Sequence, residues 1–329
     1  MGAQKVVVGN YWGRNFGDDA MLAGLAMEEP GFVRLSVVCQ RLPFAGSKVL
    51  SMASCEPIRS DALAIWRAIG ASEALIMGGG THLEFRPERA KLPQYRVLLM
   101  WLAVACAVRM RRRKFELRSI GIGPLDGPLP RLIAKSIVRL ASETSVRDAA
   151  SSACLTQWGR RHRVVPDLAV RYFKSVIDAS PPATTTPKSD PGYVLAAPAF
   201  VSFSPTWWRD AILREMSITG SEGVVLLATC RQAAGDDNDA VAIIRQVLGD
   251  ELPSSAIRVV QYDGDVDAAT ALIRSARSVV AARYHVVLAA KYFNTRVVPD
   301  FYHPKVRAAM QMPDSWGLNQ GTKSSSEGA

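Results

Sequence analysis

Three consecutive residues late in the chain, Arg283, Tyr284 and His285, have the chemistry to bind an anion and to move a proton. The apolar run 278–282 before them predicts a buried strand, and 286–293 after them predicts a helix. An arginine at such a turn, beside the N–H groups and the positive dipole end of the helix, is typical of a phosphate or carboxylate site. A histidine there can give or take a proton. The alternative is that Arg283 pairs with a structural carboxylate and that His285 is a half-buried structural histidine.

Other turns rich in glycine or arginine follow predicted strands elsewhere in the chain. They are the loop 9–17, Gly78–Gly80, Gly121–Gly123 and Arg147. Open α/β sheets hold their ligands at the carboxyl ends of their strands, so we expect these turns to line a ligand site. The first loop lacks the spacing G-x-G-x-x-G, and no acidic residue follows where a dinucleotide ribose would need one, which disfavours a nicotinamide cofactor.

The turns belong to a regular alternation of strands and helices. The expected strands are 5–9, 33–39, 74–77, 115–120, 144–146, 164–165, 193–197, 224–228, 257–261, 278–282 and 296–298. Helices are expected between them, among them 18–27, 61–69, 93–109, 129–140, 207–216, 237–248, 266–276 and 286–293. Strands that alternate with helices predict parallel sheets covered on both faces, so the fold class is α/β with doubly wound, Rossmann-like domains.

A segment rich in proline divides this alternation. Residues 180–192 contain four prolines and no large apolar side chain, which predicts a linker. We therefore expect one domain at 1–179 and a second at 193–320, facing each other across a cleft. The tail 321–329, GTKSSSEGA, is expected to be disordered.

Composition narrows the class of partner and the compartment. The chain has 329 residues and a net charge of +10, which favours anionic partners without choosing among them. The five cysteines are widely separated, with no metal-type spacing, and the chain begins without a signal peptide, so we expect a reduced, cytoplasmic protein without a metal site.

One apolar run raises the question of a membrane. Residues 97–108 are shorter than the roughly 20 residues that a spanning helix needs, so we expect no membrane crossing. The basic cluster 109–114 that follows leaves two alternatives. The helix rests peripherally on an anionic membrane surface, at the inner face of the cell membrane, or it is a core helix whose last turn carries cations that suit its dipole.

Taken together, the turns resemble the polysaccharide pyruvyl transferase family. The matching motifs, in the family's order, are GNYWGRNFGDDAML (9–22), GGG (78–80), GIGPL (121–125), SVRDAAS (145–151), PDLA (166–169) and ARYH (282–285). The first motif and the combination of S-x-R-D with R-x-H are the most specific. The sequence departs from the family where Thr81–Phe85 replaces a shorter segment and where Tyr284 replaces a leucine.

The resemblance implies a glycosyltransferase-B-like fold that moves the pyruvyl group of phosphoenolpyruvate onto two hydroxyls of a sugar in a glycan, lipid-linked or free. A cyclic ketal forms and phosphate leaves, with phosphoenolpyruvate as co-substrate and no other cofactor. It also implies that Arg147, Arg283 and His285 hold the donor and that His285 is catalytic, with the first domain on the acceptor side and the second on the donor side. Tyr284, Gly121 and Gly123 are further donor-side candidates.

The chemistry of the residues agrees with this assignment. A donor with both a phosphate and a carboxylate needs fixed cations, and the planar fork of arginine suits both groups. His285 is the candidate general acid for the methylene carbon, or alternatively a hydrogen-bond donor to the departing phosphate. Candidate bases or acceptor contacts lie on the other turns: Arg14, Asn15, Asp18, Asp19, His82 and Glu84. Helix capping explains Asp18 and Asp19 equally well, and His82 is structural or acceptor-side.

The sequence leaves alternatives open for one pair of aromatic residues and for the function of the whole chain. Trp207 and Trp208 stack on a sugar or else pack in the core. A nucleotide-sugar glycosyltransferase is the first alternative function, because it shares the paired Rossmann-like layout. A non-catalytic protein that binds an anionic glycan or nucleic acid is the second, although the basic cluster lacks interleaved aromatics, so we expect no nucleic acid partner.

Overall fold

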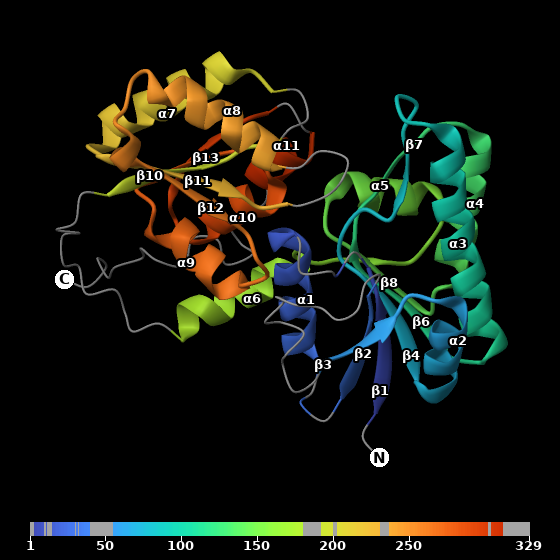
Figure 1. Cartoon of the computed structure of the whole chain (residues 1–329). Helices are drawn as coiled ribbons and strands as arrows, with labels where there is room; N and C mark the ends of the chain where they lie inside the picture. Colours follow the sequence, from blue (N-terminus) through green and yellow to red (C-terminus); the bar gives the residue numbers. More distant parts are fainter. Residues whose placement is uncertain are drawn as a thin grey trace, which may run out of the picture. The chain divides into compact units, whose positions relative to one another are not determined.

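The structure of the chain is a computed structural model (Figure 1). It describes residues 3–9, 11, 15–29, 31, 33–39, 55–179, 192–199, 203–230, 237–301 and 304–311. The chain divides into two compact units, which are described separately below. The first unit comprises Met1–Gly13 and Asp18–Tyr172, and the second comprises Arg14–Gly17 and Phe173–Ala329.

A seven-stranded parallel sheet forms the centre of the first unit, in the order β3-β2-β1-β4-β6-β8-β9. Its strands are β1 (Gln4–Val8), β2 (Arg34–Cys39), β3 (Cys55–Arg59), β4 (Ala74–Gly78), β6 (Lys114–Ile120), β8 (Glu143–Val146) and β9 (Arg163–Val164). Chain direction across the sheet reverses at the β1·β4 pair, which is where doubly wound sheets bind ligands. Every residue of β4 is buried, as expected for a strand covered on both faces.

Among the described residues, six helices accompany this sheet. They are α1 (Phe16–Glu28), α2 (Ala62–Ala71), α3 (Lys91–Met110), α4 (Pro128–Leu140), α5 (Ala149–Gln157) and α6 (Leu168–Asp178). Apolar side chains of α2, α3, α4 and α5 share one core with β1, β4, β6 and β8, and α1 lies across the opposite face (Figure 1). Two short strands, β5 (Leu83–Phe85) and β7 (Ile122–Leu125), form a separate pair in segments that the sequence led us to expect as loops.

The second unit has a five-stranded parallel sheet in the order β12-β11-β10-β13-β14. Its strands are β10 (Tyr193–Ala197), β11 (Gly223–Ala228), β12 (Ile257–Gln261), β13 (Ser278–Ala281) and β14 (Arg296–Pro299). Its helices are α7 (Pro205–Thr219), α8 (Asp237–Gly249), α9 (Val266–Ser275), α10 (Tyr284–Tyr292) and α11 (Pro304–Met310), with a 3-10 turn at Ser254–Ala256. Here the direction reverses at β10·β13, so the turn after β13 lies at the switch point.

The predicted fold class, α/β with two doubly wound parallel sheets, is confirmed. The expected linker falls almost wholly on 180–191, and the expected tail on 321–329, which lie outside the described residues. The compact units part at Tyr172 and Phe173, within α6, and residues 14–17 group with the second unit. The expectation of a linker and a tail therefore stays a prediction.

Helix α3 differs from the sequence expectation. It is a continuous helix of 20 residues whose most apolar 18-residue window has a mean hydropathy of 1.2, enough by length and composition to cross a bilayer. Only 22% of that window is buried, so most of the helix surface lies outside the core. Its buried stripe, Leu98, Trp101, Ala105 and Val108, packs in the core of the first unit. The helix therefore belongs to the layer of helices over this sheet.

Helix α1 contacts the start of α6 so closely that only glycine fits at position 24. A Cβ built on Gly24 would lie 1.9 Å from the carbonyl oxygen of Leu168, a backbone atom that cannot rotate away. Glycine costs a helix about 1 kcal/mol relative to alanine, so its presence here reflects packing rather than helix propensity.

We expect Gly24→Ala to lower the free energy of unfolding by about 2 kcal/mol, because overpacking outweighs the propensity gain. Urea unfolding followed by circular dichroism measures this. Gly249→Ala is the matched control, since a Cβ at that helical position meets nothing within 4 Å. Equal stability of the two variants would contradict the packing described for α1 and α6.

Candidate functional site

In the first unit, Arg147 lies at the carboxyl end of β8 and is 5% exposed. Its Nη1 donates to Asp167 Oδ2 at 2.6 Å, and its Nη2 donates to Thr81 Oγ1 at 3.2 Å. The serine and the aspartate of the S-x-R-D motif, Ser145 and Asp148, have structural contacts. Ser145 Oγ accepts from the backbone N–H of Ser119 at 2.9 Å, and Asp148 caps α5. These contacts fix the backbone on both sides of the arginine.

The glycine turns predicted from the sequence meet at this arginine. The Gly121 N–H donates to the Gly80 carbonyl at 2.8 Å. A Cβ on Gly121 would lie 2.9 Å from Thr81 Oγ1, so the threonine hydroxyl would have to move, and it would contact two guanidinium nitrogens of Arg147 at 3.4 Å. Gly123, two residues on, has a φ of +99°, which favours glycine. The turns at Gly78–Gly80 and Gly121–Gly123 thus lie beside Arg147 in the first unit, and that they line a ligand site stays a prediction.

The paired aspartates of the first motif differ in exposure. Asp19 is completely buried, whereas Asp18 is half-buried. Burial raises the pKa of Cys39 to about 12, and the negative charge of Asp19 adds to the shift. Burial likewise raises the pKa of Tyr11, with Asp18 and Asp167 adding to the shift. Asp18 is therefore the more accessible of the two aspartates.

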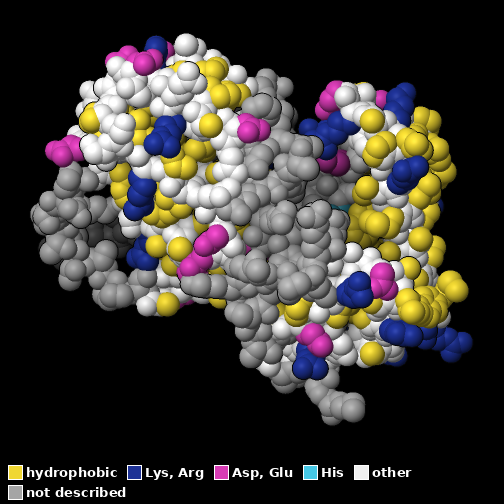
Figure 2. Space-filling model, in the orientation of Figure 1, with side chains coloured by type: hydrophobic (Ala, Val, Ile, Leu, Met, Phe, Trp, Pro, Cys, Tyr) yellow, Lys and Arg dark blue, Asp and Glu magenta, His cyan; other side chains and the backbone are white. Residues whose placement is uncertain are grey.

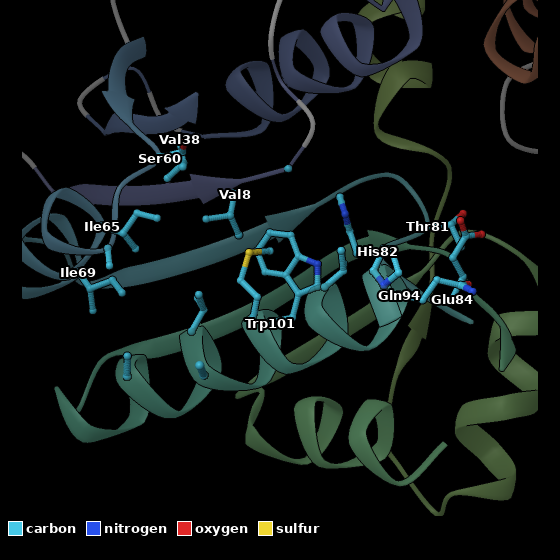
Figure 3. A pocket seen from close by; sticks show the side chains of 18 of the residues that line it. Val8, Val38, Ser60, Ile65, Ile69, Thr81, His82, Glu84, Gln94 and Trp101 are labelled. Atoms are coloured by element: carbon cyan, nitrogen blue, oxygen red, sulfur yellow. The ribbon is translucent and has the colours of Figure 1, made fainter. Parts of the chain in front are cut away.

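Two acceptor-side candidates after β4, His82 and Glu84, line a large pocket. Thr81, His82 and Glu84 lie at one end of a cavity of about 1010 Å³ that runs between α2, α3 and the sheet (Figure 3). The rest of its wall is mainly apolar, and it includes Trp101, against whose ring His82 packs edge to face. Glu84 forms ion pairs with Arg86 at 3.2 Å and with Arg89 at 3.3 Å, so its carboxylate is already engaged by two cations.

In the second unit, Arg283 occupies the position before the first residue of α10, at the carboxyl end of β13. Its Nε donates to both carboxylate oxygens of Asp237 at 3.1 Å, and its Nη2 makes a further close contact with the same carboxylate. Asp237 is fully buried and also accepts from the Thr229 N–H and hydroxyl, at 3.2 and 3.1 Å. Burial raises the pKa of Asp237, and Arg283 and Thr229 oppose that shift.

His285 lies over a glycine from the other end of the chain. A Cβ on Gly17 would come within 1.9 Å of His285 Nδ1, so the imidazole occupies the space that a side chain would need. Asn15 Oδ1 accepts from the Gly17 N–H at 3.0 Å, and Phe16 donates its N–H to the Thr229 carbonyl at 3.0 Å. The segment Asn15–Gly17 therefore joins the Arg283 turn. Tyr284 contacts the His285 ring edge to face.

Sequence reasoning located the arginines and missed their partners. Asp167 belongs to the PDLA motif, but nothing in the sequence indicates that it pairs with one of these arginines. Asp237 could be identified only as an acidic residue at the start of a predicted helix, which is a weak indication. Asn15, an acceptor-side candidate, groups with the second unit, where it forms an isolated β-bridge with Cys230. Arg14 lies outside the described residues.

The aromatic pair splits between core and surface. Trp208 is fully buried and stacks on Phe203, so it is a core residue, and Trp207 is 37% exposed. The described part of the chain holds no group of three or more His, Cys, Asp or Glu side chains that could bind a metal ion.

Each unit thus has an arginine at a strand-to-helix turn that is paired with a buried aspartate. Arg283 does pair with a buried carboxylate, that of Asp237, as one of the two alternatives from the sequence predicted. Arg147 pairs with Asp167 in the same way. Such pairing also fixes the direction of a guanidinium, which has five N–H donors. At Arg283, the N-terminus of the nine-residue helix α10 adds a positive dipole end and backbone N–H groups. Both turns have the chemistry to bind a phosphate or a carboxylate.

Solved structures with the same fold include several nucleotide-sugar enzymes. A Listeria monocytogenes protein named as a UDP-N-acetylglucosamine 2-epimerase aligns with a TM-score of 0.61 and 11% identity, over 94% of this chain and 82% of that one. The Neisseria meningitidis UDP-GlcNAc 2-epimerase aligns at 0.57 and 10%, over 94% and 85%. A Rickettsia africae glycosyltransferase aligns at 0.51 and 10%, over 91% and 79%. At these identities the likeness shows the fold alone, which is glycosyltransferase-B-like.

Sequence comparison gives a more specific result. The model of the family described as polysaccharide pyruvyl transferase matches residues 15–299. This range includes Asn15–Gly17, Arg147, Asp167, Asp237 and the Arg283 turn. A search of curated proteins finds no significant match.

We expect Asp237→Ala to lower the free energy of unfolding by about 3 kcal/mol, because it leaves Arg283 without the buried carboxylate that it faces. Asp210→Ala, which breaks the exposed pair with Arg209 at 2.8 Å, is the matched control and should leave stability almost unchanged, because water screens the pair. Urea unfolding compares the two variants. A loss at Asp237 no greater than at Asp210 would show that the buried pair does not hold the turn.

Proposed function

Because the chain belongs to the polysaccharide pyruvyl transferase family, we propose that it transfers the pyruvyl group of phosphoenolpyruvate to two hydroxyls of one sugar in a glycan or its precursor. The product is a cyclic ketal, and phosphate is released. The observation that carries the proposal is the family match over 15–299, which includes two arginine turns at the carboxyl ends of parallel strands. Turns of this kind suit a donor that bears a phosphate and a carboxylate on one small frame.

Arg283 and the start of α10 are the proposed phosphate or carboxylate contacts in the second unit. The buried Asp237 holds the guanidinium at the turn, so little side-chain entropy is lost when an anion binds. Because Asp237 already balances the charge of Arg283, the N–H groups of α10 must supply part of the stabilisation of a dianion. Arg147 has the corresponding role in the first unit, with Asp167 as its orienting partner.

The proposed reaction moves two protons. His285 protonates the methylene carbon, or else it donates a hydrogen bond to the phosphate, while a sugar hydroxyl attacks the neighbouring carbon. Loss of phosphate then allows the second hydroxyl to attack the same carbon. Both hydroxyl protons leave the sugar, one proton is added to the methylene carbon, and the other leaves with phosphate.

The acceptor is proposed to contact the turn after β4 and the start of α1. Asp18 is the candidate base, since it is half-buried where Asp19 is completely buried. His82 and Thr81 line the polar end of the pocket and offer a ring nitrogen and a hydroxyl to sugar hydroxyls. The engagement of Glu84 by two arginines makes it the weaker candidate base.

Phosphoenolpyruvate should raise the melting temperature of the protein, and UDP-sugars should not, as measured by thermal shift. Arg283→Lys keeps the charge but loses the planar fork, so donor affinity should fall about 10- to 100-fold, which corresponds to about 1.5 to 3 kcal/mol. Arg296→Lys is the control, because Arg296 pairs with Glu215 at 2.7 Å in the same unit. Stabilisation by UDP-sugars alone would favour a nucleotide-sugar glycosyltransferase.

His285→Ala should keep the thermal shift with phosphoenolpyruvate and slow phosphate release about 10²- to 10⁴-fold, since it removes the proton donor. The assay measures phosphate release with acceptors that end in galactose, glucose, mannosamine or an ulosonic acid. His162→Ala is the control, because His162 is bonded to Ser152 Oγ and to the Arg160 carbonyl in the first unit. If the two variants release phosphate at equal rates, the role proposed for His285 is wrong.

A further inference from the structure

The outward side of α3 carries an apolar stripe. Leu92, Leu99 and Met110 are 62%, 51% and 75% exposed, and Ala103 and Cys106 between them are exposed as well. With Arg96 they recur at alternating intervals of four and three residues, which places them on one side of the helix. The opposite side is the buried stripe that packs in the core of the unit. Helix α3 is therefore apolar on both sides, while only one of them is covered.

Neighbouring helices continue this surface. Helix α4 packs beside α3 and exposes Leu129 and Leu132, and α2 exposes Leu63. Figure 2 shows apolar side chains with interspersed Lys and Arg on the side of the first unit where Figure 1 places α3 and α4. We call this surface, formed by the exposed residues of α2, α3 and α4, the helical face. Monomeric soluble proteins rarely expose contiguous apolar patches of more than a few hundred Å², so the helical face calls for a partner.

The charges of the helical face have one sign. None of α2, α3 and α4 contains an Asp or a Glu. Their basic residues are Arg67, Lys91, Arg96, Arg109, Arg131, Lys135 and Arg139, and residues 111–114 directly after α3 add three arginines and a lysine. The Arg111 guanidinium lies 3.9 Å above the Trp66 ring, which connects this cluster to α2. The partner of the helical face must therefore be apolar and anionic.

We propose that the helical face binds the surface of an anionic lipid bilayer. Exposed apolar side chains would enter the headgroup boundary while Lys and Arg contact anionic lipids, as in amphipathic helices that lie in the interface. The pocket between α2 and α3 adjoins this surface, because Val97 and Met100 both line it and are exposed. Helix α3 lies on the bilayer and does not cross it, since crossing would remove its buried stripe from the core.

A second copy of the chain fits the helical face less well. A two-fold interface places the same surface against itself, so the cations around Arg96 and Arg109 would meet identical cations. No acidic residue of the three helices is present to neutralise them. An anionic bilayer satisfies the apolar residues and the cations together. The inference goes beyond the proposed function and does not depend on it.

Sedimentation of the full chain with lipid vesicles tests the proposal. Binding is expected to vesicles of phosphatidylglycerol and phosphatidylcholine, to weaken with salt, and to be absent with phosphatidylcholine alone. The variant Leu92→Ser/Leu99→Ser/Met110→Ser should lose binding. Each replaced cation should weaken binding about fivefold, so Arg96→Gln/Arg109→Gln/Arg112→Gln should weaken it about 100-fold. The control Arg214→Gln/Ile218→Ser, at exposed positions of α7, should bind like the original chain.

A probe on Cys106 gives a second readout that is independent of catalysis. Cys106 is exposed on the stripe, so a polarity-sensitive fluorophore attached there should shift to the blue with anionic vesicles. Absence of the shift, equal binding to neutral vesicles, or equal loss in the α7 control would overturn the proposal. A dimer in solution that the three Ser substitutions dissociate would also overturn it, in favour of a second copy. Phosphate release is unaffected by any of these outcomes, so the proposed function is tested separately.

Discussion

The pairing of a turn arginine with a buried aspartate is the interaction on which both candidate sites depend. A guanidinium buried without a carboxylate would be costly, and a carboxylate buried without a cation would take up a proton. Asp167 and Asp237 lower this cost in the two units, and each contacts its arginine beside the carboxyl end of a strand. The pairs therefore keep a charged, directional group where a doubly wound sheet binds its ligands. The backbone around them serves this arrangement, since Ser145 and Asp148 anchor the strand end and the helix start beside Arg147.

Alternation of apolar runs with helical patterns was enough to predict two parallel α/β sheets, because fully buried strands such as β4 and β13 leave a clear signal in sequence. Arg147 and Arg283 could be located from the sequence as well, because they follow the largely buried strands β8 and β13. Edge strand β3 was missed because its sequence, CEPIR, is polar and exposed and contains a proline. The pair β5·β7 was missed because its segments carry the signals of glycine loops.

Contacts between residues far apart in the chain could not be predicted from the sequence. The approach of Gly17 to His285 spans almost the whole chain, and a single sequence holds no signal for it. The same limit applies to Asp237, whose partner Arg283 is 46 residues away. Hydropathy showed that α3 is apolar, but it could not show which of its sides the fold leaves uncovered. Tertiary packing determines which side is uncovered, because it buries only the stripe that includes Trp101 and Val108.

Thr81 belongs to two features at once, and this has a consequence for how they influence each other. Its hydroxyl accepts from Arg147 Nη2, and its side chain also lines the end of the pocket between α2 and α3. A molecule that fills this end of the pocket would therefore be separated from the Arg147 guanidinium only by the Thr81 side chain. By thermodynamic linkage, if occupancy of the pocket changes the affinity of Arg147 for an anion, anion binding changes the affinity of the pocket by the same factor. Thr81 is the side chain through which such a coupling between the pocket and the guanidinium would pass.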